Sequence, residues 1–379
     1  MAEVKSKVDK VPFFDYKYIL GQYREELTDI MMDISSRGAF ILQDELRQFE
    51  KNLADFLGAK HSLGVGNCTD GLLLAMRAAG IGKDDEVIFS SHTFVATASA
   101  IYHNGAKPIP VECGKDHLID PKAIEAAITS RTKAIVPTQL NGQVCDMDAI
   151  IDICKRNNLI LIEDAAQSLG AKYKGKSAGT FGLASAYSYY PAKVVGCFGD
   201  GGSVVTNDDT IYEQVFLTRD HGRAKIGEVV TWGLNSRLDN LQAAILDFKL
   251  KKYPLDIERR RQIASLYQQY LEDVTEITLP LAPGANNDKY EVFQNYEVEV
   301  DANVREDLRA YLSQKGIGTI LQWGGKAVHE FEGLGLKYSL PFTESLMRRA
   351  FLLPMNTSLS NDEVIYVAEH LRSYFGYGK

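Results

Sequence analysis

The sequence predicts a three-layer α/β/α protein with a mostly parallel central sheet, plus a smaller α+β domain at the C-terminal end. Between residues 62 and 162, short and almost wholly apolar segments alternate with helical ones, which is typical of buried parallel strands. After about residue 250 the pattern changes to a long helix and a strand of mixed polarity. We therefore expect a large domain over residues 1–249, with a helical N-terminal segment, and a small domain over residues 250–379.

The composition excludes several classes of protein. A chain of 379 residues with 45% apolar content can build a large core or two domains. Its formal net charge of -8 predicts no nucleic-acid partner. We see no charged leader before an apolar segment and no apolar run of membrane-spanning length, so we expect a cytoplasmic protein without membrane contact. The five cysteines include no C-x-x-C pair and the histidines lack metal-ligand spacing, so we expect neither disulfides nor a metal.

The elements of the large domain follow from periodicity and turn residues. One amphipathic helix is expected from Asp44, as its N-cap, to Leu57, with Gly58 as the C-cap signal. Five short apolar segments are expected to be strands: Ser62–Gly66, Glu86–Phe89, Lys107–Val111, Ala134–Pro137 and Leu159–Ile162. Four segments between them have helical patterns: Asp70–Ala79, Ala96–His103, Pro121–Ala127 and Met147–Arg156. Ligands of such sheets bind at the carboxyl ends of strands, and four side chains lie at or just beyond such ends: Thr69, Phe94, Asp164 and Ser188.

The C-terminal part has a different texture. An amphipathic helix is expected over about Ile257–Tyr270, and Phe293–Val300 alternates like a half-exposed strand. Arg305–Lys315 is expected to be a helix that ends at Gly316. The capping box at Ser360–Glu363 opens a closing helix that runs to about Phe375.

The segment Gly64–Gly71 combines a strand, a glycine-rich turn and the start of a helix. Free backbone N–H groups and the helix dipole attract an anion at such a place, and Thr69 can add a hydroxyl donor. Asn, Thr and Asp are also ordinary helix caps, so the pattern by itself fits either a phosphate site or a plain cap. It is neither a Walker A loop nor G-x-G-x-x-G, which disfavours a dinucleotide.

Lys193 and Asp164 suggest a specific chemistry when they are considered together. Lys193 ends the segment Tyr187–Lys193 and is followed by the glycines of Gly199–Gly202, which let backbone pass close to a bulky ring. Taken alone it fits a surface lysine, and Asp164 in Glu163–Gln167 fits a cap after a strand. Together they suggest a Schiff-base lysine and the acid that holds a pyridinium nitrogen, which is the pattern of pyridoxal 5′-phosphate (PLP).

Other side chains extend this hypothesis. Gln167 could donate to the phenolic oxygen of the ring, and the Ser188 hydroxyl could bind the phosphate. Phe94, at a strand end, could stack on a flat cofactor, although such an aromatic residue is more often part of the core. The polar turn Trp232–Asp239 is, by itself, typical of a loop and helix cap.

Four segments, in this order, carry a resemblance: Glu163–Gln167, Ser188–Lys193, Gly199–Gly202 and Asn235–Asp239. From about Gly38 to its end the chain resembles the PLP-dependent nucleotide-sugar aminotransferases of the DegT/StrS type, which have the fold type I of aspartate aminotransferase. The resemblance implies transamination of a 3-keto- or 4-keto-6-deoxy sugar nucleotide, with glutamate as amino donor. The amino sugar would serve the biosynthesis of a surface glycan or lipopolysaccharide.

The resemblance also implies roles for single residues. Lys193 would be the catalytic lysine and Asp164 the partner of the pyridine nitrogen, with Gln167 beside the phenolic oxygen. Thr69 and Ser188 would bind phosphate, and Phe94 would lie on the ring. Asn235 would reach the phosphate of a neighbouring subunit in a homodimer with shared active sites. Arg237 would lie close to the substrate; His329 would face it or would be an ordinary surface histidine.

The chain departs from the family pattern at several positions. Cys68 stands where glycine is usual; it would be strained at φ > 0, and otherwise its N–H still serves the phosphate. Ala192 and Val194-Val195 replace the more usual Gly and Asn-Leu around the lysine. Leu140–Gly142 replaces a Leu-Tyr-Gly run, and Trp323–Gly325 stands where Tyr-Pro is usual. The last two departures put the identity of the sugar in doubt.

Three alternatives stay open. A related sugar dehydratase is disfavoured because it would carry histidine in place of Lys193. An NAD-dependent sugar oxidoreductase would need G-x-G-x-x-G after the first strand, which Gly64–Gly71 does not provide. A non-catalytic PLP-binding regulator would be expected to carry a DNA-binding module or a basic arm, and the sequence suggests neither.

Overall fold

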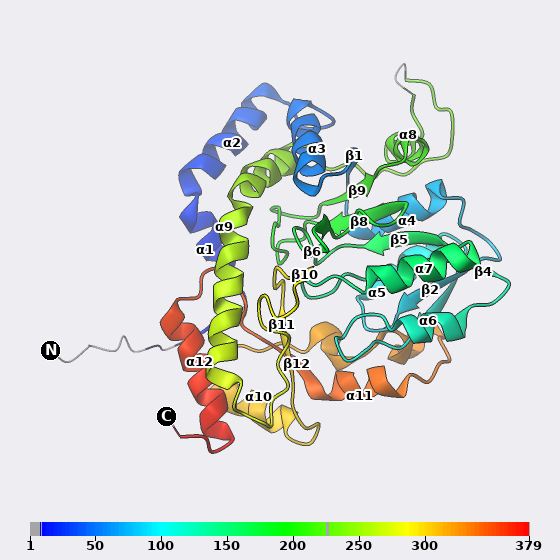
Figure 1. Ribbon diagram of the computed structural model, residues 1–379. Helices are drawn as coiled ribbons and strands as arrows, with labels where there is room; N and C mark the ends of the chain where they lie inside the picture. Colours follow the sequence, from blue (N-terminus) through cyan, green and yellow to red (C-terminus); the bar gives the residue numbers. More distant parts are fainter. Residues whose placement is uncertain (1–7, 9, 225–226, 379) are drawn as a thin grey trace.

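A seven-stranded sheet forms the centre of the molecule (Figure 1). The computed structural model describes residues 8, 10–224 and 227–378. In order across the sheet the strands are β1 (His61–Val65), β9 (Gly202–Thr206), β8 (Ala184–Ser188), β5 (Ile160–Asp164), β4 (Thr132–Val136), β2 (Glu86–Ser90) and β3 (Lys107–Val111). Only β9 runs against its neighbours, so the predicted mostly parallel sheet is confirmed. Because β8 and β9 are antiparallel neighbours, the segment 189–201 that joins them stays at the carboxyl end of β8.

Helices cover both faces of this sheet, which gives the predicted three layers. One face packs against α4 (Cys68–Ala78), α5 (Val95–His103) and α8 (Asp209–Thr218). The other packs against α3 (Asp44–Leu57), α6 (Pro121–Ala127), α7 (Met147–Asn157) and the first half of α9 (Asn240–Leu271). Alternate residues of a strand face opposite sides, so Val87 and Phe89 of β2 join the first core while Ile88 joins the second.

A third apolar core lies in the C-terminal part. It joins the second half of α9 to β11 (Tyr296–Glu299), α10 (Arg305–Gln314), β12 (Ala350–Leu353) and α12 (Asn361–Tyr374). Val11 also belongs to this core and pairs with Ile317. The expected division between residues 249 and 250 falls inside α9, whose two halves pack on different cores. The division into two domains stays a prediction.

Helix α9 is much longer than the helix expected over Ile257–Tyr270. It has 32 residues and continues through Pro254, which cannot donate a backbone hydrogen bond. Proline inside a helix costs about 3 kcal/mol. Leu246, Leu250 and Tyr253 before it and Ile257 after it are all buried, and this burial offsets the cost.

The N-terminal segment is helical, as expected. Helices α1 (Tyr16–Gln22) and α2 (Arg24–Arg37) lie beside α9 (Figure 1), where the rings of Tyr23 and Phe248 meet edge to face at 5.4 Å. The remaining elements are short. They are the strands β6 (Lys172–Tyr173), β7 (Lys176–Ser177) and β10 (Lys289–Tyr290), the helix α11 (Pro341–Arg349), and three 3₁₀ turns at Gln322–Gly325, Val328–Glu330 and Glu332–Leu334.

The predicted helix ends are partly right. Gly58 ends α3 in the left-handed conformation and Ser360 forms the capping box of α12, as expected. Asp44, however, is the first residue of α3, and the N-cap position belongs to Gln43. Helix α4 begins two residues earlier than expected because the Asn67 side chain caps it, accepting a hydrogen bond from the Asp70 N–H at 2.8 Å.

The expectation of a half-exposed strand at Phe293–Val300 is wrong. In β11 the acidic side chain of Glu297 is only 3% exposed, although it alternates with apolar residues. His117, which lies 180 residues earlier in the chain, binds the Glu297 carboxylate at 2.8 Å. A buried carboxylate with a charged partner does not need water, so the alternating pattern did not predict exposure.

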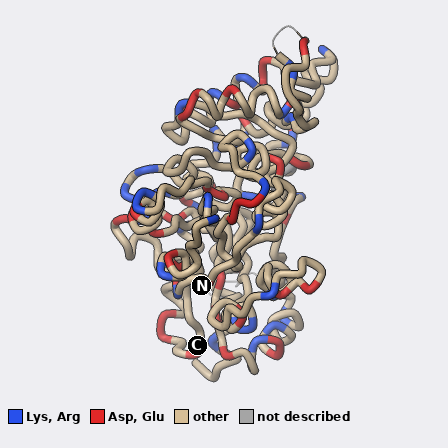
Figure 2. Tube along the Cα trace, turned by 90° about the vertical axis from the view of Figure 1, so that its right-hand side faces the viewer, with Lys and Arg blue, Asp and Glu red and all other residues tan. Residues whose placement is uncertain are grey.

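Further properties concern the chain as a whole. Within the described residues no helix is both long and apolar enough to span a bilayer. All five cysteines are free and buried. Lys and Arg are interspersed with Asp and Glu over the trace in Figure 2, so neither sign of charge forms a single block in that view.

Candidate active site

Four parallel strands bring the residues predicted to bind a ligand to one edge of the sheet. β1, β2, β5 and β8 end just before Thr69, just before Phe94, at Asp164 and at Ser188. Thr69 and Ser188 are half-buried. Phe94 precedes α5 and is 55% exposed, so the alternative of an ordinary core aromatic residue is wrong. Side chains far apart in sequence therefore lie along the same edge of the sheet, at the carboxyl ends of the strands.

Asp164 is buried and tightly held. Its Oδ2 accepts a hydrogen bond from the Thr97 hydroxyl at 2.6 Å, and its Oδ1 accepts one from the Ala166 N–H at 3.2 Å. Burial raises the pKa of Asp164, against the hydrogen bonds of Thr97 and Ala166 and the charge of Lys193, which lower it. A cation at this place would restore the charged carboxylate.

Lys193 lies on the connection between β8 and β9, and the charge of its amine interacts electrostatically with Asp164 and Cys68. Burial around the amine lowers the pKa of Lys193, while Cys68 and Asp164 oppose this shift. The backbone of the loop is held by a hydrogen bond from the Lys193 N–H to the Tyr190 carbonyl at 2.8 Å. An amine with a lowered pKa is more often neutral, which is the form that attacks a carbonyl.

The start of α4 has the geometry of an anion site. Cys68 and Thr69 are its first two residues, so their N–H groups have no acceptor within the helix. Cys68 has a helical backbone, and the strain considered for this position does not arise. Burial, together with Asp164, raises the pKa of its thiol well above the usual value, so the side chain is neutral.

Close contact with another part of the backbone explains why residue 202 is a glycine. A Cβ atom at this residue would lie 2.5 Å from the carbonyl carbon of Asn67 and 2.7 Å from the nitrogen of Cys68. The start of β9 therefore passes directly beside the first turn of α4. The expected reason for the glycine run was space beside a ring, whereas at Gly202 the close contact is with backbone.

Gln167 is buried, and one end of its amide is occupied. Its Oε1 accepts hydrogen bonds from the Asn141 N–H at 2.9 Å and from Asn295 Nδ2 at 3.4 Å. The amide nitrogen of Gln167 is therefore the end left for a ligand.

Asn235 and Arg237 follow a loop and differ in exposure. Asn235 is exposed, and Ser236 beside it accepts a hydrogen bond from the Gly66 N–H at 3.0 Å, which fixes this segment next to β1. Arg237 pairs with Asp220 at 2.5 Å. The positive charge of its guanidinium group is thus already paired with an acid of the same chain.

His329 is buried, with 6% of its surface exposed, so the alternative of an ordinary surface histidine is wrong. Its Nδ1 accepts from or donates to the Ser91 hydroxyl at 2.7 Å, and its Nε2 lies 3.3 Å from a Glu344 oxygen. Ser91 directly follows β2, so this histidine of the C-terminal part lies beside the strand that leads to Phe94.

Sequence reasoning missed several residues of this site. Thr97 could have been suspected because it lies in the first turn of α5, one turn after Phe94. Asn141 was noted only as part of a departure from the family pattern, and nothing linked it to Glu297, because the hydrogen bond between their side chains joins residues 156 positions apart.

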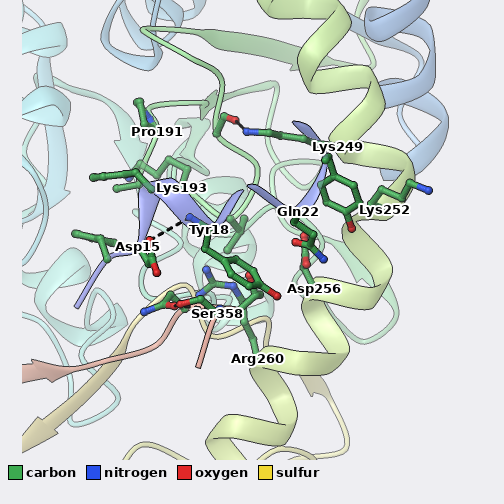
Figure 3. A pocket seen from close by; sticks show the side chains of 18 residues that line it. Asp15, Tyr18, Gln22, Pro191, Lys193, Lys249, Lys252, Asp256, Arg260 and Ser358 are labelled. Carbon is green, nitrogen blue, oxygen red and sulfur yellow. Dashed lines mark hydrogen bonds between the residues drawn. The ribbon is translucent and has the colours of Figure 1, made fainter. Parts of the chain in front are cut away.

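A separate pocket lies beside Lys193, between the lysine loop, α1 and α9 (Figure 3). Lys249 in this pocket donates to the Gly196 carbonyl and lies 4.7 Å from the Phe198 ring centroid; burial lowers its pKa to about 8. The pocket holds about 70 Å³, well below the roughly 300 Å³ of a small-molecule site. Asp164 does not line it. We therefore place the candidate active site at the strand ends.

Known proteins resemble this chain over nearly its whole length. A "Pleiotropic regulatory protein" of Geobacillus stearothermophilus is 38% identical over 96% of this chain and 98% of its own. A "dTDP-3-amino-3,6-dideoxy-alpha-D-galactopyranose transaminase" of Aneurinibacillus thermoaerophilus is 39% identical over 96% and 99%. The crystal structure of DesV of S. venezuelae, in complex with a ketimine intermediate, superposes with a TM-score of 0.93 at 35% identity, covering 98% of this chain and all of DesV.

The fold of these relatives agrees with the architecture described above, in which a mostly parallel sheet presents a lysine and an acid at the strand ends. Residues 22–372 match the DegT/DnrJ/EryC1/StrS aminotransferase family. This match covers more than half of the chain, and it includes every residue of the candidate site. The chain belongs to the DegT/DnrJ/EryC1/StrS aminotransferase family.

Proposed function

We propose that this aminotransferase uses PLP to transfer an amino group from glutamate to a keto-sugar nucleotide. One observation carries the proposal: the amine of Lys193 interacts electrostatically with the buried acid Asp164, at the sheet edge where α4 begins. Burial lowers the pKa of this amine. Sugar specificity is proposed from the relatives, one of which is named as a dTDP-amino-sugar transaminase. The substrate would be a 3-keto- or 4-keto-6-deoxy sugar, destined for a surface glycan or lipopolysaccharide, and the reaction would take place in the cytoplasm.

The residues at the strand ends fit PLP. Asp164 is buried and disfavoured as an anion, and a protonated pyridine nitrogen would supply the cation that it lacks. The free N–H groups of Cys68 and Thr69, with the hydroxyl of Ser188, would hold the phosphate. Phe94 is exposed at the same edge and would cover the ring, and Gln167 would donate to its phenolic oxygen.

When bound, PLP supplies an electron sink for a carbanion at the substrate carbon. Asp164 would keep the proton on the pyridine nitrogen, and Thr97 holds Asp164 in place through its 2.6 Å hydrogen bond. Lys193 Nζ would hold the cofactor through its aldehyde carbon. Once the amino donor has taken its place there, the freed amine would remove a proton from the substrate carbon as general base and deliver it to that cofactor carbon as general acid. Burial lowers the pKa of this amine and so favours the neutral form that can accept a proton.

Arg237 and His329 would contact the substrate, and Asn235 would reach the phosphate in a second copy of the chain. The exposed position of Asn235 supports a homodimer with shared sites.

The proposal is tested by incubating the PLP-loaded protein with glutamate and a panel of keto-sugar nucleotides, with dTDP, UDP and GDP carriers and ketones at C3 or C4. Mass spectrometry should detect an amino sugar together with an equal amount of 2-oxoglutarate. A dehydrated sugar without 2-oxoglutarate would support the dehydratase alternative. Binding of PLP without any turnover would support the regulator, which the name of the Geobacillus relative keeps open. The family match overturns the NAD-dependent oxidoreductase.

A further inference from the structure

Asn141 occupies an unusual place between the sheet edge and the C-terminal part. It lies in a tight turn and has a left-handed backbone, with φ of 56°, and the following Gly142 has φ of 85°. Asparagine is among the few residues other than glycine that adopt this conformation readily. A Cβ atom at residue 142 would lie 2.6 Å from the backbone nitrogens of Phe293 and Gln294, so the turn presses against the segment before β11.

The backbone of Asn141 determines which end of the Gln167 amide is free. Its N–H donates to Gln167 Oε1 at 2.9 Å, and Asn295 Nδ2 approaches the same oxygen at 3.4 Å. An amide whose oxygen is occupied by donors must present its NH₂ group on the other side. The NH₂ group of Gln167 is therefore the end of the amide that remains available as a hydrogen-bond donor.

The side chain of Asn141 is held by three residues of the C-terminal part. Its Nδ2 donates to Glu297 Oε2 at 2.8 Å, and its Oδ1 accepts from Asn295 Nδ2 and from Gln322 Nε2, both at 2.9 Å. All four side chains are buried. Within this network each amide has one orientation only, because turning the Asn141 amide over would place two oxygens against each other.

Two histidines keep Glu297 in its accepting, charged form. His117 Nδ1 lies 2.8 Å from Glu297 Oε2, and His92 Nε2 lies 3.4 Å from Oε1. Burial favours the neutral acid, but the two histidines dominate and hold the pKa of Glu297 well below its usual range. The carboxylate can therefore accept from Asn141 throughout the neutral pH range.

We propose that Asn141 is a positioning residue for the cofactor. Its backbone N–H and its anchored side chain together aim the NH₂ group of Gln167 at the phenolic oxygen of PLP. Through Gln167 and Asn141, that oxygen would be connected to Glu297, Asn295 and Gln322 of the C-terminal part. This inference rests on the proposed function, because it requires PLP at the strand ends.

The test measures the pH midpoint of the visible band of bound PLP. The midpoint is the pKa of a proton of the chromophore that the negative charge on the phenolic oxygen helps to retain. A hydrogen bond donated to this oxygen withdraws negative charge from it, so the proton is held less strongly and the midpoint is lower. Losing a well-aimed donor should therefore raise the midpoint. Asn141→Gly keeps the left-handed backbone and removes the anchor, so its midpoint should rise by roughly half a unit to one unit. Asn158 also has a left-handed backbone, with φ of 52°, at the end of α7, so Asn158→Gly is the matched control and should leave the midpoint unchanged.

A double variant separates positioning from a general structural effect. Gln167→Leu removes the donor and should raise the midpoint by itself. If Asn141 acts through Gln167, adding Asn141→Gly to Gln167→Leu should cause no further shift. A further shift in the double variant, or an unchanged midpoint in Asn141→Gly, would overturn the inference. If Asn141→Gly does not fold, Asn141→Asp tolerates the same backbone and places a charge against Glu297, and it should raise the midpoint as well.

The wild-type protein separates this inference from the proposed function. If wild-type protein mixed with PLP develops no visible band, the proposed function fails, whatever the variants do. If the wild type has the band and transaminates, but the midpoint is insensitive to Asn141→Gly and Asn141→Asp, only the role of Asn141 fails.

Discussion

Lys193 and Lys249 show how two amines in the same neighbourhood receive different environments. Burial lowers the pKa of both. The Lys249 ammonium is engaged by the Gly196 carbonyl and the Phe198 ring, whereas the amine of Lys193 acts on Asp164 and Cys68. Position relative to an acid at the strand ends, rather than basicity alone, distinguishes the lysine proposed to bind the cofactor.

Lys193→Ala should abolish transamination, and borohydride reduction should no longer yield a peptide that carries PLP. The melting temperature should stay within a few degrees of the wild-type value. Lys249→Met is the matched control, because it removes the other burial-shifted amine of the same region and should keep the trapped adduct on Lys193. Peptide mapping after reduction provides the measurement. An adduct found on Lys249, or normal turnover by Lys193→Ala, would refute the assignment.

At the scale of elements, the site is formed where chain segments cross at close range. The first turn of α4 meets the start of β9 at Gly202, and β11 meets the turn at His117 through ion pairs. Both junctions join segments more than 100 residues apart. Each depends on a feature of the junction itself, the absence of a Cβ in one case and a charge pair in the other.

Gly202→Ala should displace the first turn of α4, because its Cβ would come within 3 Å of backbone atoms that cannot move independently. We expect a loss of about 1–3 kcal/mol in the free energy of unfolding and weaker PLP binding. Gly333→Ala is the control, since a Cβ there meets nothing within 4 Å. Equal denaturation midpoints and equal PLP affinities for the two variants would contradict the close approach.

The ion pairs of β11 predict a pH dependence of stability. Although burial opposes its charge, Glu297 raises the pKa of His117 to about 9, above the value of about 6.5 for an unfolded chain. A raised pKa stabilises the fold fully below pH 6.5, and this contribution is lost as the pH rises to 9. The loss is at most about 3 kcal/mol. Urea denaturation at both pH values should show a smaller decrease for His117→Gln than for wild type; equal decreases would exclude the pair as the cause.

At the scale of the whole molecule, several exposed apolar residues lie close in the chain to residues of the candidate site. Trp232 is 93% exposed near Asn235, and Phe94, Tyr190 and Phe198 are exposed apolar residues near the strand ends or on the lysine loop. Exposed apolar groups of this kind mark interaction surfaces. They support the proposed homodimer, in which Asn235 of one copy would serve the site of the other.

Shared sites predict complementation between two inactive variants. Lys193→Ala and Asn235→Ala dimers should each lose most of their activity. Unfolding and refolding them as an equal mixture should restore roughly a quarter of wild-type turnover, because half of the dimers are mixed and each has one intact site. Mixing without unfolding is the control. No gain after refolding, in a mixture shown to contain mixed dimers, would place Asn235 in the site of its own chain.

Contiguous motifs were readable from the sequence because their chemistry lies within a few residues. The acid after β5, the lysine before the glycine run, the start of α4 and the alternating elements of the sheet all have local signals. The mostly parallel sheet and the family followed from these signals, and both are confirmed. The sequence by itself thus determined the class of fold and the type of chemistry expected at the strand ends.

Tertiary structure alone decided how the site is held. Thr97 reaches Asp164 across 67 residues, and Asn141 reaches Glu297 across 156. Such pairs depend on strand order and on the close contact of two cores along α9, which local propensity does not encode. Glu297 was expected to be half-exposed for the same reason: its partners His92 and His117 belong to another part of the chain. Burial, hydrogen-bond orientation and shifts in pKa arise only when distant segments pack together.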